Sequence, residues 1–243
     1  MSIVLEIEGL TGGYTKGVTI LEGIDLKVAR GEAVGILGLN GSGKSTLGKA
    51  LMNLLPYRTG VIAFNGKDIS GLTTPELART GFSLMHQGGD IFPGLTVQQH
   101  LDLAWDGTRD REYRQYLERT IPILRHPGWS LLHRNADKLS GGERHQLALA
   151  MALARKPEVL ILDEPSDGLT PKAVDDTYAI LDGIRKEYGM TVLLIEQNVA
   201  HAVAFCDRCV VLRNGSIHKE IKKEDVGSIS GSDYMTNMLQ YLF

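Results

Sequence analysis

The segment GLNGSGKST, residues 38–46, contains the residue types needed to bind a nucleotide phosphate. It fits the pattern G-x-x-x-x-G-K-[ST], follows the apolar run 33–37 and precedes the helical pattern TLGKALMNLL. Glycines let backbone N–H groups surround phosphate oxygens at a helix N-terminus, where the helix dipole favours negative charge. Lys44 would then reach the β- and γ-phosphates, and Ser45 would ligate magnesium. A chance glycine-rich turn is the alternative, but the strand–loop–helix context favours a phosphate site.

Two carboxylates end a second apolar run, in VLILDEP at residues 159–165. Asp163 emerges at the carboxyl end of a predicted strand, which is where ligands bind in open α/β sheets. It could hold magnesium directly or through water, and Glu164 could polarise the attacking water. A solvated turn is the alternative interpretation, and the phosphate loop in the same chain argues against it.

The segment LSGGE, residues 139–143, begins a helical pattern but carries two adjacent glycines at its first positions. Ser140 and Glu143 fit a capping box, which is a purely structural explanation. A capping box does not require Gly141 and Gly142, because better helix formers fit those positions. Bare N–H groups at a capped helix N-terminus make a phosphate site. Since the phosphate loop already surrounds the phosphates, this second set of donors would have to approach the γ-phosphate from another side.

Composition and charge narrow the class of protein. The chain has 243 residues, a formal net charge of -3 and 43% hydrophobic residues, which are ordinary globular values. An acidic balance disfavours nucleic-acid binding. The start, MSIVLEIEGL, has no signal-peptide pattern, and no apolar run approaches the roughly 20 residues that span a bilayer. We therefore expect a soluble intracellular protein with no nucleic-acid partner.

The cysteines and histidines carry no convincing metal pattern. Cys206 and Cys209 form C-D-R-C, whose spacing would suit a redox or metal pair. We interpret them instead as a helix end followed by the buried strand CVVL, because a second ligand pair is missing. His145 and His201 are interpreted as surface residues of helices.

Apolar runs alternate with helical patterns, which indicates an α/β fold with a parallel sheet. The runs predicted to be buried central strands are 33–37, 82–85, 159–162 and 192–195. Antiparallel strands are expected before about Lys27. Asn-Gly pairs at 65–66 and 214–215 predict two hairpins.

The character of the chain changes between about residues 96 and 138. LTVQQHLDLAW and DREYRQYLERTI are helical patterns, and the second places Tyr113, Tyr116, Leu117 and Ile121 on one face. This pattern predicts a helical insertion in an α/β core.

Taken together, the phosphate loop, LSGGE and DEP resemble the ATP-binding cassette (ABC) ATPases over essentially the whole chain. The resemblance implies a single domain over residues 1–243. Its P-loop NTPase (RecA-like) core would span about 1–90 and 139–243, with an antiparallel β side, and its inserted α-helical subdomain about 91–138. Two cassettes would enclose two ATP molecules head to tail, so that LSGGE of one subunit contacts the γ-phosphate held by the other.

The resemblance also implies roles for individual residues. Tyr14 sits where the family has an aromatic that stacks on adenine, although a turn tyrosine is the alternative. Gln87 matches the glutamine that senses magnesium and couples to the membrane partner. The implied groups are magnesium ligands Ser45, Gln87 and Asp163, catalytic residues Glu164 and Gln197, and the partner-ATP signature Ser140, Gly141, Gly142 and Glu143. The implied ATP-binding residues are Tyr14, Gly38, Asn40, Gly41, Ser42, Gly43, Lys44, Ser45, Thr46 and Gln87.

Two positions depart from the general pattern of the family. Gln197 stands where a switch histidine is usual; it can donate a hydrogen bond to phosphate but does not titrate near neutral pH. The alternative is that Gln197 only starts the next helix. Thr170 replaces an expected aspartate, and Asp167 is nearby but out of register. Both departures leave the rate of hydrolysis open.

The strings HQGGDIFPGLTV, DEPSDGLTP and LLIEQN resemble ATPases of branched-chain (hydrophobic) amino-acid importers and their amide- or urea-importing relatives. The resemblance implies ATP and Mg2+ as cofactors. It implies transmembrane permease subunits, a second ABC ATPase subunit and a solute-binding protein as partners, at the cytoplasmic face of the cell membrane. One alternative is a non-transport ABC ATPase in nucleic-acid repair or translation, which would carry a coiled-coil insertion or a second cassette. Another is a small-molecule P-loop kinase, which LSGGE argues against.

Overall fold

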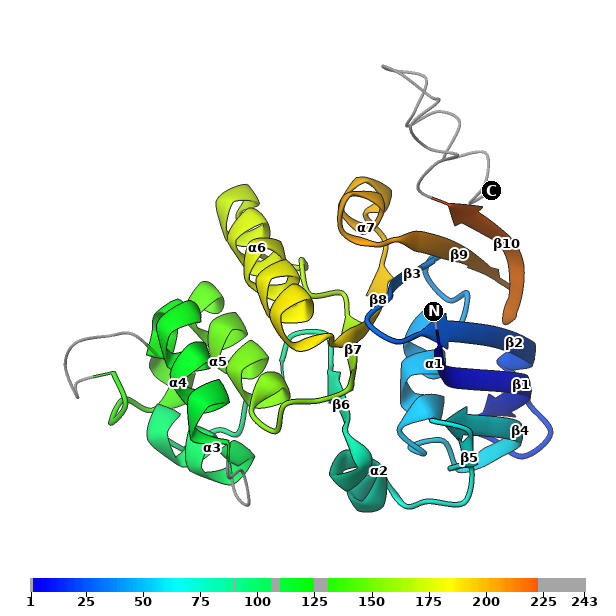
Figure 1. Cartoon of the computed structure of the whole chain (residues 1–243), viewed down its shortest axis with the longest axis horizontal. Coiled ribbons are helices and arrows are strands. Elements are labelled where there is room, and N and C mark those ends of the chain that lie inside the picture. Colours follow the sequence, from blue (N-terminus) through cyan, green and yellow to red (C-terminus); the bar gives the residue numbers. More distant parts are fainter. Residues whose placement is uncertain (1, 90, 106–109, 125–130, 223–243) are drawn as a thin grey trace.

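The computed structural model describes residues 2–89, 91–105, 110–124 and 131–222. Its strands form two sheets, in the orders β2-β1-β4-β5 and β10-β9-β3-β8-β7-β6 (Figure 1). The strands are β1 Ile3–Gly13, β2 Leu21–Ala29, β3 Ala33–Leu37, β4 Tyr57–Phe64, β5 Lys67–Asp68, β6 Phe82–Met85, β7 Val159–Asp163, β8 Thr191–Glu196, β9 Arg208–Arg213 and β10 Ser216–Lys222. The α-helices are α1 Lys44–Leu51, α2 Thr74–Thr80, α3 Val97–Trp105, α4 Arg111–Thr120, α5 Gly141–Leu153, α6 Pro171–Tyr188 and α7 Val199–Phe205.

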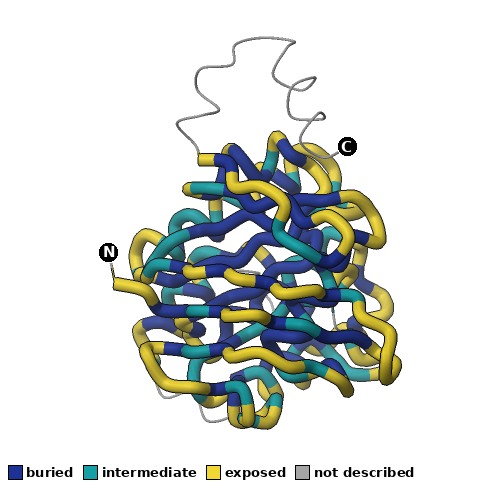
Figure 2. The backbone as a smooth tube through the Cα atoms, turned by 90° about the vertical axis from the view of Figure 1, so that its right-hand side faces the viewer, coloured by how far each residue is buried: buried dark blue, intermediate teal, exposed yellow. Residues whose placement is uncertain are grey.

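The first sheet is antiparallel, as expected for the start of the chain. β1 pairs with both β2 and β4, and buried and exposed positions alternate along the strands of this face (Figure 2). The alternation follows from the two-residue period of a strand that packs on one side only. Both predicted hairpins are confirmed. Asn65 and Gly66 join β4 to β5, Asn214 and Gly215 join β9 to β10, and all four have the positive φ of a type I′ turn.

The second sheet contains the four strands predicted from apolar runs, and their carboxyl ends meet at one edge. The parallel register pairs Leu37 with Glu196 and Asp163 with Ile195. The segments that follow β3, β7 and β8 therefore leave the sheet side by side, where α/β proteins bind ligands. One part of the prediction is wrong. β6 is an edge strand rather than a central one, and its two middle residues are only half buried because β7 alone pairs with it.

Two hydrophobic cores cover the two faces of the parallel sheet. Along β3, Val34 and Ile36 belong to one core and Leu37 to the other, as the two-residue period of a strand requires. α1 packs in the core shared with the antiparallel sheet, while α5, α6 and α7 cover the opposite face. Gly48 lets α1 approach the sheet closely, since an added Cβ would lie 3.0 Å from Cδ1 of Ile195.

The predicted helical insertion is present as α3 and α4, which group with α5 beside the parallel sheet (Figure 1). The predicted apolar face of α4 is correct: Tyr113 and Leu117 are buried, as is Ile121 at its end. The Tyr113 hydroxyl donates to the Leu153 carbonyl of α5 at 3.0 Å. Its ring also meets Tyr188 of α6 edge-on at 4.8 Å. α5, whose first residues come from LSGGE, is thereby held by both the inserted helices and the core.

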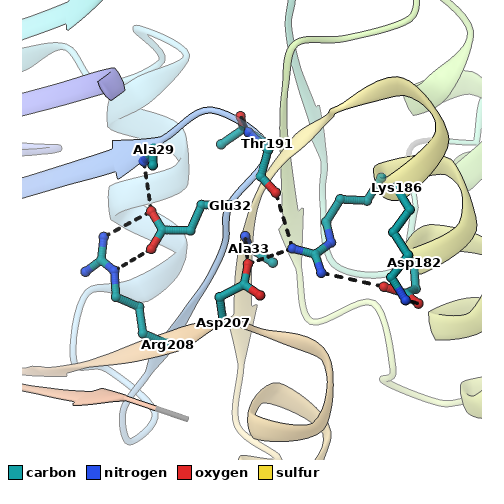
Figure 3. Close-up of polar contacts among 10 residues, drawn as sticks. Ala29, Glu32, Ala33, Asp182, Lys186, Thr191, Asp207 and Arg208 are labelled. Atoms are coloured by element: carbon teal, nitrogen blue, oxygen red, sulfur yellow. Dashed lines mark hydrogen bonds and ion pairs between the residues drawn. The ribbon is translucent and has the colours of Figure 1, made fainter. Parts of the chain in front are cut away.

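A polar network holds the start of β3, at the edge opposite the phosphate loop (Figure 3). Glu32 pairs with Arg208 at 2.7 Å, and each side chain is only 15% exposed. Asp207 accepts the N–H of Ala33 at 2.8 Å and pairs with Arg185 of α6 at 2.6 Å. Because the Glu32–Arg208 pair is largely buried, water screens it less than it screens a surface ion pair. These contacts tie the strand that leads into the phosphate loop to β9 and α6.

The structure also tests the interpretation of Cys206, Cys209, His145 and His201. Cys206 ends α7 and Cys209 lies in β9, both buried and free, which confirms the structural interpretation of C-D-R-C. The surface interpretation of His145 and His201 is wrong, because both are half buried. His145 lies on α5, which packs against α3. The ring of His201 lies 5.7 Å from that of Tyr178 in α6.

Candidate functional site

The phosphate loop joins β3 to α1 around a cavity of about 430 Å³. Its geometry requires three of its glycines. An added Cβ at Gly38 would lie 2.4 Å from the Leu212 carbonyl oxygen, and Gly41 and Gly43 have φ of 80° and 104°. The predicted residues that line this cavity are Asn40, Gly41, Gly43, Lys44, Ser45, Thr46, Gln87, Glu164 and Gln197. Gly38 and Ser42 are absent from the lining, and Ile20 is a lining residue that no sequence pattern indicated.

Lys44, the first residue of α1, is the cation of the loop and is 5% exposed. Its Nζ donates to the carbonyls of Gly38 at 2.9 Å and Leu39 at 3.2 Å. Burial lowers the pKa of Lys44, and the negative charges of Glu164 and Asp163 oppose that shift. Burial deprives this ammonium group of water, and phosphate oxygens within hydrogen-bond distance would stabilise its charged form.

Ser45 and Asp163 meet as the two motifs predict. The Ser45 hydroxyl donates to Oδ1 of Asp163 at 3.0 Å, across the gap between α1 and the end of β7. Burial raises the pKa of Asp163, and the hydrogen bond from Ser45 partly offsets that rise. A cation placed between these two oxygen donors would remove the cost of burying the carboxylate.

Glu164 is held by two amides from two different loops. Nε2 of Gln87 donates to Oε2 at 2.8 Å, and Nε2 of Gln197 donates to Oε1 at 2.6 Å. The backbone of Glu164 has φ of 50°, a left-handed conformation that is strained for a residue with a side chain. Its N–H donates to the Ile195 carbonyl of β8 at 2.9 Å, which holds this conformation. The structure thus brings together three predicted residues that are far apart in sequence.

The departure from the family pattern at Thr170 has a local explanation. Gln87 also donates to Asp167 at 3.1 Å, so that aspartate lies beside the site although it is out of register. Thr170 caps α6, its hydroxyl accepting the N–H of Ala173 at 3.4 Å. A threonine is a good N-cap residue, so the replaced position has a structural role here.

Tyr14 lies beside the phosphate-loop helix but outside the cavity lining. It follows β1, is 43% exposed, and its ring centre lies 5.6 Å from Nζ of Lys49 on α1. An exposed aromatic ring at this place can stack on a nucleotide base. Such stacking depends little on the identity of the base, because every base has a π-face. Its contact with adenine stays a prediction.

The LSGGE segment does not join the cavity within this chain. It forms the predicted capping box at the start of α5, where the Ser140 N–H donates to Glu143 at 2.8 Å and Ser140 Oγ accepts the Glu143 N–H at 3.3 Å. Gly141 and Gly142 have no positive φ, and an added Cβ at either would meet no atom within 4 Å. In the described part of the chain, neither conformation nor packing therefore requires glycine at these two positions.

The fold and the site define a P-loop nucleoside triphosphatase, and comparison with known proteins narrows the class. The family model described as ABC transporter matches residues 21–167. The chain is 34% identical over 211 residues to the probable branched-chain amino acid transport ATP-binding protein LivF of Archaeoglobus fulgidus, covering 86% of this chain and 87% of that protein. It is 33% identical over 204 residues to the high-affinity branched-chain amino acid transport ATP-binding protein BraG of Pseudomonas aeruginosa, covering 84% and 87%.

Among solved structures, an ATP-binding subunit of an ABC transporter matches with a TM-score of 0.79 and 29% identity, covering 97% of this chain and 99% of the other. The chain belongs to the ABC transporter family. It is an ATP-binding ATPase of that family, as the sequence motifs predict.

Proposed function

We propose that this chain powers the import of a branched-chain or other hydrophobic amino acid, or of an amide, through separate permease subunits. The observation that carries the proposal is the pair of amides on Glu164 beside the Ser45–Asp163 contact at the phosphate-loop cavity. This arrangement supplies the groups that ATP hydrolysis needs. The names of the two relatives support the import branch and the class of substrate.

Magnesium is the ion that the donors fit. Ser45 Oγ, the Asp163 carboxylate and the Gln87 amide oxygen are hard oxygen ligands, and magnesium completes its shell with water and phosphate oxygens. Within the described residues, no group of three His, Cys, Asp or Glu side chains could hold a metal alone. The ion therefore depends on the nucleotide, and when bound it would neutralise charge on the phosphates.

Glu164 is the candidate general base. Each of its carboxylate oxygens accepts one amide hydrogen, so the group is held still where it lines the cavity. A carboxylate placed there can take the proton of a water that attacks the γ-phosphate. The Gln197 amide and Lys44 are donors that can stabilise the negative charge of the transferred phosphoryl group.

The signature segment is proposed to act on a second subunit. The open space around Gly141 and Gly142 supports this role, because bare N–H groups at the start of α5 leave room for another subunit's nucleotide.

Glu164→Gln should bind ATP, hydrolyse it slowly and accumulate a closed dimer, measured by size-exclusion chromatography with ATP and magnesium. Full turnover by Glu164→Gln in the assembled transporter would refute the role of Glu164.

A groove between the core and the inserted helices is the proposed permease contact. It has a volume of about 490 Å³ and lies between β6 and α2 on one side and α3 and α5 on the other. Leu54, Phe92 and Leu103 line it and are 43%, 51% and 58% exposed. Exposed apolar side chains around a groove favour a helix of a partner. Because Gln87 lies close along the chain to Phe92, the groove and the hydrolysis site share one loop.

No helix of the described residues has the length and apolar character to cross a membrane. The transport proposal therefore includes permease partners, a second ATPase and a solute-binding protein, with this chain at the cytoplasmic face of the cell membrane.

Affinity capture of the tagged chain from detergent-solubilised membranes tests these partners. We expect membrane-spanning proteins and an ATPase to co-purify. Recovery of soluble proteins alone, with no membrane-associated pool, would contradict the proposal.

Uptake of labelled leucine, valine and a short amide by cells tests the class of substrate. Cells that carry Glu164→Gln should lose uptake of at least one of these while keeping wild-type levels of the complex. Unchanged uptake of all of them would exclude the proposed substrates.

A further inference from the structure

We infer that Tyr178 and Glu196 form a positioning pair for ATP hydrolysis, which fixes the backbone from which Gln197 reaches Glu164. Neither Tyr178 nor Glu196 lines the cavity, so the pair acts through its neighbours. The inference rests on the proposed roles of Gln197 and Glu164.

Glu196 anchors the backbone at the point where the chain leaves β8. It is 2% exposed, and its Oε2 accepts the N–H of Gln197 at 3.1 Å and of Asn198 at 3.2 Å. Its Oε1 accepts the Tyr178 hydroxyl at 2.8 Å. Within the described residues Glu196 has no ion-pair partner, so these three donors satisfy the buried carboxylate. Because the carboxylate accepts both consecutive backbone N–H groups, it fixes the direction of the backbone at Gln197.

Tyr178 holds this anchor near the segment that follows Glu164. It lies on α6, and burial raises the pKa of its hydroxyl, which stays a proton donor at neutral pH. The side chain of Ser166, which follows Glu164 closely in sequence, acts on the same hydroxyl and opposes the rise of its pKa. The Tyr178 ring lies 5.3 Å from that of Phe205 in α7, which keeps it in place. The Tyr178 hydroxyl therefore bonds to Glu196, which holds the backbone of Gln197, and lies near the segment that carries Glu164.

Gln197 needs such an anchor because its own side chain is exposed. Its hold on the site is the single amide contact with Glu164 at 2.6 Å. A glutamine side chain rotates about several bonds, so the position of its amide group depends on the position of its backbone. If the turn after β8 shifts, the amide is misplaced, and a shift of about 1 Å in a catalytic geometry can slow a reaction strongly.

A double-mutant cycle tests the inference on the full-length chain with its co-purified partners. Tyr178→Phe removes only the hydroxyl, and we expect about a threefold lower kcat with an unchanged KM for ATP. Gln197→Ala removes the donor itself and should lower kcat roughly tenfold. Since the pair acts through Gln197, the double variant should be as slow as Gln197→Ala alone.

Two further variants separate positioning from stability. Glu196→Gln keeps the shape and one carbonyl acceptor for the backbone N–H groups, so it should fold and lose about twofold to threefold in kcat. Tyr188→Phe is the matched control on the same helix. Tyr188 packs on the rings of Tyr113 and Tyr116, away from the cavity, and its variant should keep the wild-type kcat.

The outcomes distinguish this inference from the proposed function. If Gln197→Ala is slow while Tyr178→Phe and Glu196→Gln are as fast as wild type, the positioning role is refuted and the role of Gln197 stands. Losses that multiply in the double variant would also refute it, because Tyr178 would then act independently of Gln197. If Gln197→Ala is as fast as wild type, the proposed role of Gln197 is wrong and the positioning role falls with it.

Discussion

At the scale of single residues, burial has shifted the charged groups of the site from their ordinary behaviour. Burial lowers the pKa of Lys44 and raises that of Asp163, so each is less stable in its charged form than it would be in water. Evolution keeps such groups where function needs them, at a cost in stability. Bound phosphate and magnesium would reverse this cost, which couples ligand binding to the stability of the fold.

Lys44→Ala should weaken ATP binding by about tenfold or more, because charge-assisted contacts with phosphate are the strong ones. Titration with a fluorescent ATP analogue measures the affinity. Lys186→Ala is the control, since Lys186 pairs with Asp182 on α6 and lies outside the cavity. Equal affinities of Lys44→Ala and wild type would remove Lys44 from phosphate binding.

Asp163→Asn should abolish hydrolysis but raise the melting temperature of the nucleotide-free chain at neutral pH. Because burial raises the pKa of Asp163 in the fold, its ionised form costs stability at every pH above that pKa. Asparagine removes the charge and keeps an oxygen acceptor for Ser45. The gain should shrink as the pH falls through the pKa of Asp163 and the wild-type carboxyl takes up its proton.

Asp182→Asn is the control of opposite sign for this experiment. The hydrogen bond from Lys186 lowers the pKa of Asp182, so its ionised form stabilises the fold at neutral pH, and the variant should melt at a lower temperature. Melting curves recorded between about pH 4 and pH 8, a range that covers ordinary and raised carboxyl pKa values, measure both variants. A lower melting temperature for Asp163→Asn at neutral pH would contradict the prediction.

At the scale of elements, the helix N-termini differ in whether a side chain caps them and in how much space surrounds their first residues. Side chains cap α5, α6 and α7 in the described chain, through Ser140, Thr170 and Asn198. α1 begins without a side-chain cap, directly from the left-handed Gly43 of the phosphate loop. α5 alone among these four combines a cap with two unhindered glycines, so its N–H groups are accessible although its start is well defined.

Gly142→Leu should leave the fold intact and prevent formation of the closed dimer in the Glu164→Gln background. Leucine favours a helix more than glycine does, and its Cβ meets no atom of the described chain, so the melting temperature should not fall. Its side chain would occupy the space proposed for the partner's nucleotide. Size-exclusion chromatography with ATP and magnesium measures the dimer.

Gly71→Leu is the control, because Gly71 is exposed and, like Gly142, has no positive φ and has open space around it. This variant should dimerise like its Glu164→Gln parent. A normal dimer with Gly142→Leu would show that the signature does not contact the second subunit.

At the scale of the whole molecule, the groove and the hydrolysis site lie on either side of one edge strand. β6 lines the groove and leads directly to Gln87, whose amide holds Glu164. The ring of His100 in α3 lies 5.8 Å from that of Phe92, and its Nε2 accepts the Phe92 N–H at 2.9 Å. The contact of α3 with Phe92 places the inserted helices beside the residues that carry Gln87.

Leu103→Asp should reduce the amount of permease that co-purifies by at least about tenfold, as loss of a central apolar contact does in other interfaces. Leu103 is exposed in the groove, so a charge there should not disturb folding. Val61→Asp on β4 is the control, another exposed apolar site, which lies outside the groove. Equal recovery of the permease with both variants would rule out the groove as the contact.

The local features of this protein could be predicted from its amino-acid sequence. The phosphate loop, the apolar strands, the two Asn-Gly hairpins and the Ser140–Glu143 capping box each depend on residues a few positions apart, so their spacing carries the information. The same motifs, taken in their order along the chain, also predicted the family.

Tertiary structure alone decided which distant residues meet. The edge position of β6, the burial of His145 and His201, and the contact of Tyr178 with Glu196 have no local pattern. Each depends on how helices and strands pack over long separations in the chain. The same packing makes Glu196, at the end of β8, the anchor of Gln197. Its burial and its three hydrogen-bond donors are properties of the folded molecule and have no local sequence pattern.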